Sequence, residues 1–116
     1  MLAWHDALNN GDIARLLSLS TEDVEVGGPR GVGRGAELLR DWFSRAGARL
    51  EPIRWADRAE TVVVEQAARW PDADGHLTEP QTVASVFRLL DGRVDSVVRY
   101  PDFGAALEAA GLSYQS

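Results

Sequence analysis

The sequence predicts an α+β domain in which helices lie on one face of an antiparallel sheet. Residues 2–17 and 36–46 place apolar side chains at helical spacing, whereas residues 48–100 contain runs in which apolar and polar residues alternate. A period of two indicates strands with one buried face, and such a face needs a layer of helices to cover it. Because the strands follow one another along the chain, the sheet is expected to be a meander.

Two short helices are expected at the start of the chain. Leu2, Trp4 and Leu8 recur at helical spacing, and a second apolar set starts at Ile13, after the sequence NNGD. Glycine ends helices and aspartate is a favoured N-cap, so Asp12 is expected to cap the second helix.

The stretch VEVGGPRGVGRG, residues 24–35, follows a short alternating run and precedes the next helix. A loop that binds phosphate would also lie before a helix. Its glycines, however, match neither GxGxxG nor GxxxxGK, and the chain has no lysine. We therefore interpret the stretch as a short strand that ends in a bend. The helix after it is expected over residues 36–46 and should end at Gly47.

Three or four strands are expected next, over residues 48–57, 60–70, 81–90 and 93–100. Asp91 and Gly92 join the last two, and this pair supplies the positive φ angles of a two-residue hairpin loop.

The remaining segments are a loop and a final helix. PDADGHLTEP, residues 71–80, is expected to be an exposed hairpin turn. It has part of a calcium loop in Asp72 and Asp74 but lacks the third acidic ligand and the closing glutamate. Asp102 is expected to cap a short helix over residues 102–112.

Composition limits the chemistry of this chain, which is expected to be a single domain over residues 1–116. It has no cysteine, and all 12 basic residues are arginine, so thiolate, disulfide and lysine Schiff-base chemistry are excluded. A net charge of −6, with arginines spread along the chain, argues against nucleic acid as a partner. His5 and His76 are isolated in the sequence, so neither a metal nor a cofactor is expected.

The chain also lacks the features that direct proteins into or across membranes. It has no apolar run of the roughly 20 residues that a membrane span needs, and its start does not resemble a secretory signal. A cytoplasmic protein that does not contact membranes is therefore expected.

Two segments carry a resemblance to a known superfamily. They are WHDALNNGDIARLLSLSTEDVEVGGPRGVGRGAELLRDWF and VFRLLDGRVDSVVRYPDFGAALEAAGL. Both resemble the nuclear transport factor 2-like superfamily, which includes ketosteroid isomerases, SnoaL-type polyketide cyclases and limonene epoxide hydrolases. The resemblance implies a curved antiparallel sheet of four to six strands, wrapped by N-terminal helices into a cone. It also implies an apolar pocket and, in many members, a homodimer.

The resemblance also implies which catalytic groups are missing. The tyrosine, strand aspartic acid and proton-shuttling aspartate of the ketosteroid isomerases correspond to Trp4, Ser85 and Gly28. The Asp-Arg-Asp set of the epoxide hydrolases is not matched either, since Gln66 begins the strand segment that should carry its Arg-x-Asp part. Asp102 alone matches the acidic base of the SnoaL-type cyclases, and its alternative role is the helix cap described above.

Strand alternation predicts which side chains face the pocket, if Ser85 does. Residues expected to face inward are Val62, Val64, Gln66, Ala68, Val83, Phe87, Val98 and Tyr100. Residues expected to face outward include Asp95, Val97 and Arg99. The pocket is then nearly uncharged, with Asp102 at its mouth. The outer sheet face carries mixed charge, which suits a dimer interface and a solvated surface equally well.

Three functions remain open from the sequence. The first is binding of a small, neutral, hydrophobic or cyclic molecule, because the predicted pocket is nearly uncharged. The four tryptophans either fill the core or, in part, line a cavity for a flat ligand. Its expected contacts are Trp4, Val26, Trp42, Trp55, Gln66, Ser85, Phe87 and Val98. The second is an isomerase or cyclase with Asp102 as general base and Tyr100 or Gln66 polarising a carbonyl. The third is a domain that only associates with a second copy through the outer sheet face.

Overall fold

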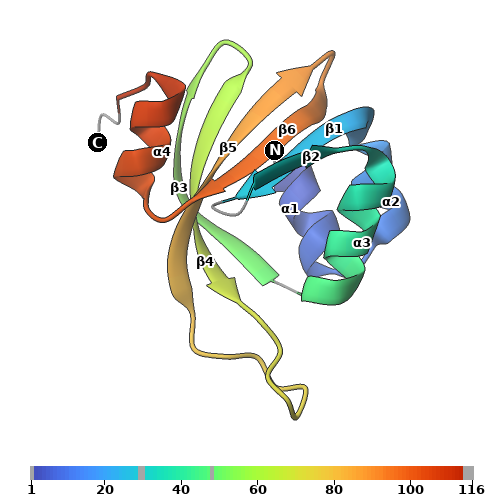
Figure 1. Cartoon of the computed structure of the whole chain (residues 1–116). Coiled ribbons are helices and arrows are strands. Elements are labelled where there is room, and N and C mark those ends of the chain that lie inside the picture. The colour runs from blue at the N-terminus through green and yellow to red at the C-terminus, as the bar shows by residue number, and fades with distance from the viewer. Residues whose placement is uncertain (1, 29–30, 48, 114–116) are drawn as a thin grey trace.

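A computed structural model describes residues 2–28, 31–47 and 49–113 of the chain. A single six-stranded sheet separates three N-terminal helices from one C-terminal helix (Figure 1). The elements are α1 (Leu2–Asn9), α2 (Ile13–Ser18), β1 (Ser20–Gly28), β2 (Gly31–Arg34), α3 (Ala36–Ala46), β3 (Arg49–Arg58), β4 (Thr61–Arg69), β5 (Gln81–Leu90), β6 (Arg93–Tyr100) and α4 (Phe103–Ala110). None of the helices in the described ranges is both long and apolar enough to cross a membrane.

The strand order is β2-β1-β6-β5-β4-β3. Neighbouring strands are antiparallel except for β1 and β6, which are parallel. The predicted α+β class and the meander from β3 to β6 are therefore confirmed, and the sheet is mixed rather than wholly antiparallel. After β1 the chain continues through β2 and α3 to β3, at the opposite edge of the sheet. It then returns strand by strand through β4 and β5 to β6, which lies beside β1 and runs parallel to it.

Local signals placed most element boundaries correctly. The Asp12 carboxylate accepts a hydrogen bond from the Arg15 amide at 3.1 Å and caps α2. Gly47 ends α3 in the left-handed conformation, with φ at 58°. Asp91 and Gly92 have φ angles of 51° and 82°, as a two-residue hairpin requires. Ala48, the predicted first residue of a strand, lies outside the described residues.

The stretch VEVGGPRGVGRG is a β-hairpin, so its interpretation as a simple bend is wrong. β1 continues to Gly28 and pairs with β2, with Val26 opposite Gly33. Pro29 and Arg30 lie outside the described residues. Gly33 allows β2 to lie close to α3, because a Cβ atom at this position would collide with the Leu38 side chain of α3. Glycine also has a low strand propensity, which hides this second strand from pattern analysis.

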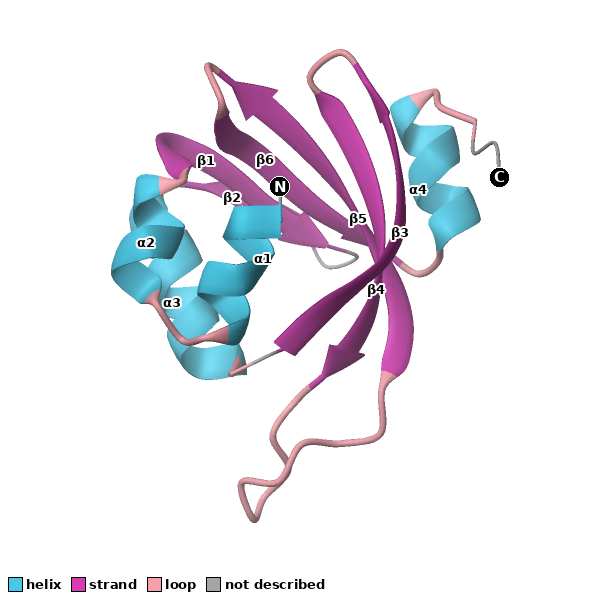
Figure 2. Ribbon diagram, turned by 180° about the vertical axis from the view of Figure 1, so that it is seen from behind, coloured by secondary structure: helices cyan, strands magenta, loops and turns pink. Residues whose placement is uncertain are grey.

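The main core lies between α1–α3 and the inner face of the sheet. Figure 2 shows from behind that these three helices lie on one side of the sheet and α4 on the other. The Trp4 and Phe87 rings meet edge to face at 5.1 Å, and Trp4 Nε1 donates to the Ser20 hydroxyl at 3.1 Å. Asn9 fastens α1 to β3, since its side chain bonds both the amide and the carbonyl of Leu50 at 2.8 Å. These contacts fix α1 against the inner face of the sheet.

The last helix lies on the opposite face, which corrects the prediction that all helices share one face. Phe103 and Ala106 of α4 pack against Val63 and Val86 of the outer sheet face. The Arg54 guanidinium lies 4.5 Å from the centre of the Phe103 ring. A dimer through the outer face stays a prediction, and it would have to form beside α4.

We expect that Asp102→Ala lowers the free energy of unfolding by about 1 kcal/mol, because the Asp102 carboxylate accepts from the Ala105 amide at 2.7 Å and caps α4. Urea denaturation followed by circular dichroism measures the change. Asp74→Ala removes the same charge from an exposed loop and serves as the control. Equal destabilisation by both changes would contradict the capping role.

Candidate functional site

A large cavity of about 670 Å³ opens between α1, α3, the β1–β2 hairpin and the inner face of the sheet. Three tryptophans form much of its wall: Trp4 on α1, Trp42 on α3 and Trp70 directly after β4. Aliphatic side chains of Val26, Leu38, Leu50 and Val97 fill the spaces between them. Aromatic walls of this kind suit a flat ring system, which gains contact area on each indole face.

The glycines of the β1–β2 hairpin form the rim of the large cavity. Gly27, Gly28, Gly31 and Gly33 all contribute to its lining. At Gly28 an added Cβ atom would meet only the Cβ atom of Arg99, at 3.9 Å. The absence of a side chain at Gly28 therefore leaves space inside the cavity, next to Arg99.

Arg99 is the one charged residue among the described residues that line the large cavity. It lies on β6 directly opposite Ser85 of β5, so the two side chains are neighbours on the same face of the sheet. Its guanidinium carbon lies 5.7 Å from the centre of the Trp70 ring. A cation–π contact at this distance orients the guanidinium along the aromatic wall while its N–H groups remain donors.

The predicted orientation of β6 is wrong. Arg99 and Val97 line the large cavity. Tyr100 instead packs on the outer face of the sheet, against the buried cluster that α4 forms with β4 and β5, and Val98 is paired with Val86 of that cluster. The pairing shifts from Arg88↔Ser96 to Leu89↔Val94, which leaves Asp95 as an extra residue in β6. This bulge inverts the alternation, so both Val94 and Val97 belong to the inner core although they are three residues apart.

Three buried side chains form a polar chain beneath the large cavity. The Ser85 hydroxyl donates to Gln66 Oε1 at 2.8 Å, and Gln66 Nε2 lies 2.8 Å from His5 Nε2. In this orientation of the amide its nitrogen donates, so His5 Nε2 accepts, which requires the tautomer with the ring proton on Nδ1. Gln66 has no exposed surface, and this pairing satisfies both ends of its amide.

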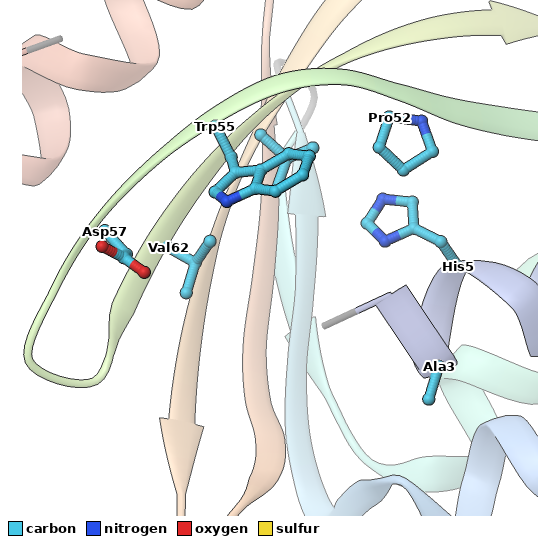
Figure 3. Close-up of a pocket in the computed structure, with 7 residues that line it drawn as sticks. Ala3, His5, Pro52, Trp55, Asp57 and Val62 are labelled. Atoms are coloured by element: carbon cyan, nitrogen blue, oxygen red, sulfur yellow. The ribbon is translucent and has the colours of Figure 1, made fainter. Parts of the chain in front are cut away.

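His5, at the far end of the polar chain, lines a small cavity of about 400 Å³. Pro52 and Trp55 of β3 face His5 of α1 across this cavity, with Asp57 further along β3 (Figure 3). Trp55 is 49% exposed. The polar chain therefore runs through the core from one cavity to the other.

The structure brings only part of the predicted site together. Trp4, Val26, Trp42 and Ser85 line the large cavity, and Trp55 lines the small one. Gln66 and Phe87 point inward as predicted, but both are fully buried beneath the cavities.

Asp102 belongs to neither cavity. It is exposed and caps α4, on the other side of the sheet. Its position does not support a role as general base for a ligand in the large cavity.

The sequence pattern predicted Arg99 on the outer face and indicated no role for His5, which is an isolated histidine in the sequence. The inward orientation of Arg99 follows from the pairing of β5 with β6. The alternation of residues within β6 alone does not reveal it. The segment 71–80 is an exposed turn as expected, because Asp72 Oδ1 accepts from the amides of Asp74 and His76.

Comparison with known proteins agrees with this architecture. The family model described as SnoaL-like domain matches residues 1–97. Among curated protein sequences, none matches this chain significantly.

Several solved structures have the same fold. TerC, co-crystallised with polyporic acid, has a TM-score of 0.75 and 21% identity, and the alignment covers 92% of both chains. A putative polyketide cyclase from Xanthomonas campestris pv. campestris has a TM-score of 0.74 and 21% identity, with 90% of this chain and 88% of that one covered. An NTF2-like protein of unknown function from Burkholderia pseudomallei K96243 has a TM-score of 0.71 and 18% identity, with 92% and 91% covered.

At these identities the solved structures establish a common fold and nothing about the ligand. The family model covers most of the chain, from α1 into β6. The chain therefore belongs to the SnoaL-like domain family and has the fold of the NTF2-like structures.

Proposed function

We propose that this protein binds a small, mostly apolar ring compound in the large cavity, with an anionic or carbonyl oxygen of the ligand at Arg99. The observation that carries the proposal is a wall of three tryptophans with a single arginine among the described lining residues. The cavity volume of about 670 Å³ lies within the range of small-molecule sites. The ligand is thus a ring compound, as predicted from the sequence, but it carries an anionic or carbonyl oxygen where the sequence predicted a neutral molecule.

Arg99 favours an oxygen with negative charge for two reasons. Its guanidinium always carries a proton, and its planar fork of N–H groups matches a carboxylate or a pair of carbonyl oxygens. No described carboxylate lines the large cavity, so a ligand anion would not compete there with a built-in partner. The contact with Trp70 holds the guanidinium near the ring-binding wall.

Binding is favoured over the isomerase or cyclase alternative by the groups that line the cavity. Proton transfer needs a base within hydrogen-bond reach of the substrate. The described lining of the large cavity contains neither a carboxylate nor a histidine, and Asp102 caps α4 instead. TerC was co-crystallised with polyporic acid, which supports an organic acid as a ligand that this fold accepts.

The first test is the binding of 2-naphthoate, a flat ring system with one carboxylate, measured by isothermal titration calorimetry and tryptophan quenching. We expect Arg99→Gln to weaken binding by about tenfold or more, because a charge-assisted hydrogen bond is lost. Arg88→Gln is the matched control, since Arg88 is exposed and lines neither cavity. Absence of saturable binding to the unmodified protein, or equal loss in both variants, would overturn the proposal.

The second test fills the space beside Arg99 with a carboxylate. We expect Gly28→Asp to reduce affinity for 2-naphthoate by about tenfold, because the new carboxylate pairs with the Arg99 guanidinium and repels the ligand. Gly28 has no positive φ angle and its added Cβ atom meets no atom closer than 3.9 Å, so the backbone accepts a side chain. Gly28→Asn has the same shape without the charge and should bind nearly as well as the unmodified protein. Identical affinities of the two variants would place the ligand anion elsewhere.

A further inference from the structure

We propose that the polar chain holds Ser85 as a hydrogen-bond acceptor, so that the large cavity selects ligands with a hydroxyl next to the oxygen bound by Arg99. This inference rests on the proposed function and specifies its ligand class. It assigns His5 and Gln66, which do not line the large cavity, a role in its specificity.

The first step is the direction of the hydrogen bonds. A serine hydroxyl has one proton and two lone pairs, and in solution it rotates to donate or accept as needed. Here the single proton of Ser85 points to Gln66 Oε1 at 2.8 Å. Only its lone pairs remain for a ligand in the large cavity, which Ser85 lines.

The second step is that His5 fixes this direction from the far end of the chain. If the Gln66 amide turned over while the His5 proton stayed on Nδ1, the amide oxygen would face the lone pair of His5 Nε2 at 2.8 Å. Two acceptors in contact are unfavourable, and Gln66 is 0% exposed, so water does not relieve the conflict. The His5 tautomer with its proton on Nδ1 therefore keeps Gln66 Oε1 on Ser85, whereas the tautomer with its proton on Nε2 would accept the turned amide.

The third step is the position of Ser85 relative to Arg99. The two residues are directly paired across β5 and β6, and both line the large cavity. Directly opposed side chains on one sheet face have Cβ atoms about 5 Å apart. One ligand can therefore place a hydroxyl on Ser85 and a neighbouring oxygen on Arg99.

These steps define a ligand class. The matching group is a hydroxyl beside a carboxylate or carbonyl, as in a 2-hydroxy acid or an enol next to a carbonyl, attached to a ring that contacts the tryptophans. A ligand with an ether or a second carbonyl in place of the hydroxyl brings an acceptor against the Ser85 lone pairs.

The experiment uses hydroxy(2-naphthyl)acetate and methoxy(2-naphthyl)acetate, which share the ring and the carboxylate but differ in the hydroxyl proton. We expect the hydroxy compound to bind about three- to tenfold more tightly to the unmodified protein. Ser85→Ala should remove most of this preference by weakening the hydroxy compound alone. The extra methyl group of the methoxy compound acts in both proteins, so the change in the affinity ratio isolates the hydrogen bond. Ser18→Ala, on the exposed side of α2, is the control and should leave the ratio unchanged.

The inference would be overturned if the affinity ratio of the two compounds were the same in the unmodified protein and in Ser85→Ala. It would also be overturned if the unmodified protein bound the methoxy compound more tightly than the hydroxy compound. In either case 2-naphthylacetate would still bind if the proposed function is right, whereas loss of all three ligands would refute both. A second measurement needs no ligand: ¹⁵N NMR of the histidine rings, with His76→Gln to assign the signals, should show the His5 proton on Nδ1. A proton on Nε2 would reverse the chain and overturn the inference.

Discussion

The hydrogen bonds of Gln66 are the constraint on which the interior of this protein depends. An amide with no exposed surface must be paired at both ends, because an unpaired buried polar group costs about 1–3 kcal/mol. Gln66 of β4 meets this need with His5 on α1 and Ser85 on β5. The contacts that hold α1 on the sheet therefore also form the polar chain between the two cavities. An apolar residue in place of Gln66 would fill the core, but no hydrogen-bond chain would then link Ser85 to His5.

The fold was predictable because its signals are local. Asp12, Gly47 and the Asp91-Gly92 pair each act through their own backbone neighbourhood, so their effects can be read from a few adjacent residues. The glycine-rich strand β2 was missed because its pairing with β1 and its contact with Leu38, rather than any strand propensity, determine its conformation.

The site was predictable only where the sheet is regular. β4 and β5 alternate without interruption along their pairing, and the inward orientations of Gln66 and Ser85 followed correctly. The bulge in β6 is a property of two paired strands, and one extra residue exchanges the inward and outward sets beyond it. Arg99 was therefore assigned to the wrong face. The most important charge of the cavity was hidden by a single-residue irregularity.

The distribution of proton donors supports the proposed binding function over the isomerase or cyclase alternative. In the ketosteroid isomerases, which the sequence resembles, donors stabilise an oxyanion and an aspartate moves the proton. Here the corresponding serine, Ser85, gives its only proton to Gln66, and the corresponding position of the aspartate is Gly28. Arg99 remains as a hydrogen-bond donor among the described lining residues. Under the proposed function, Arg99, Ser85 and the aromatic walls would orient a ligand, and none of the described lining residues is a carboxylate or histidine that would take its proton.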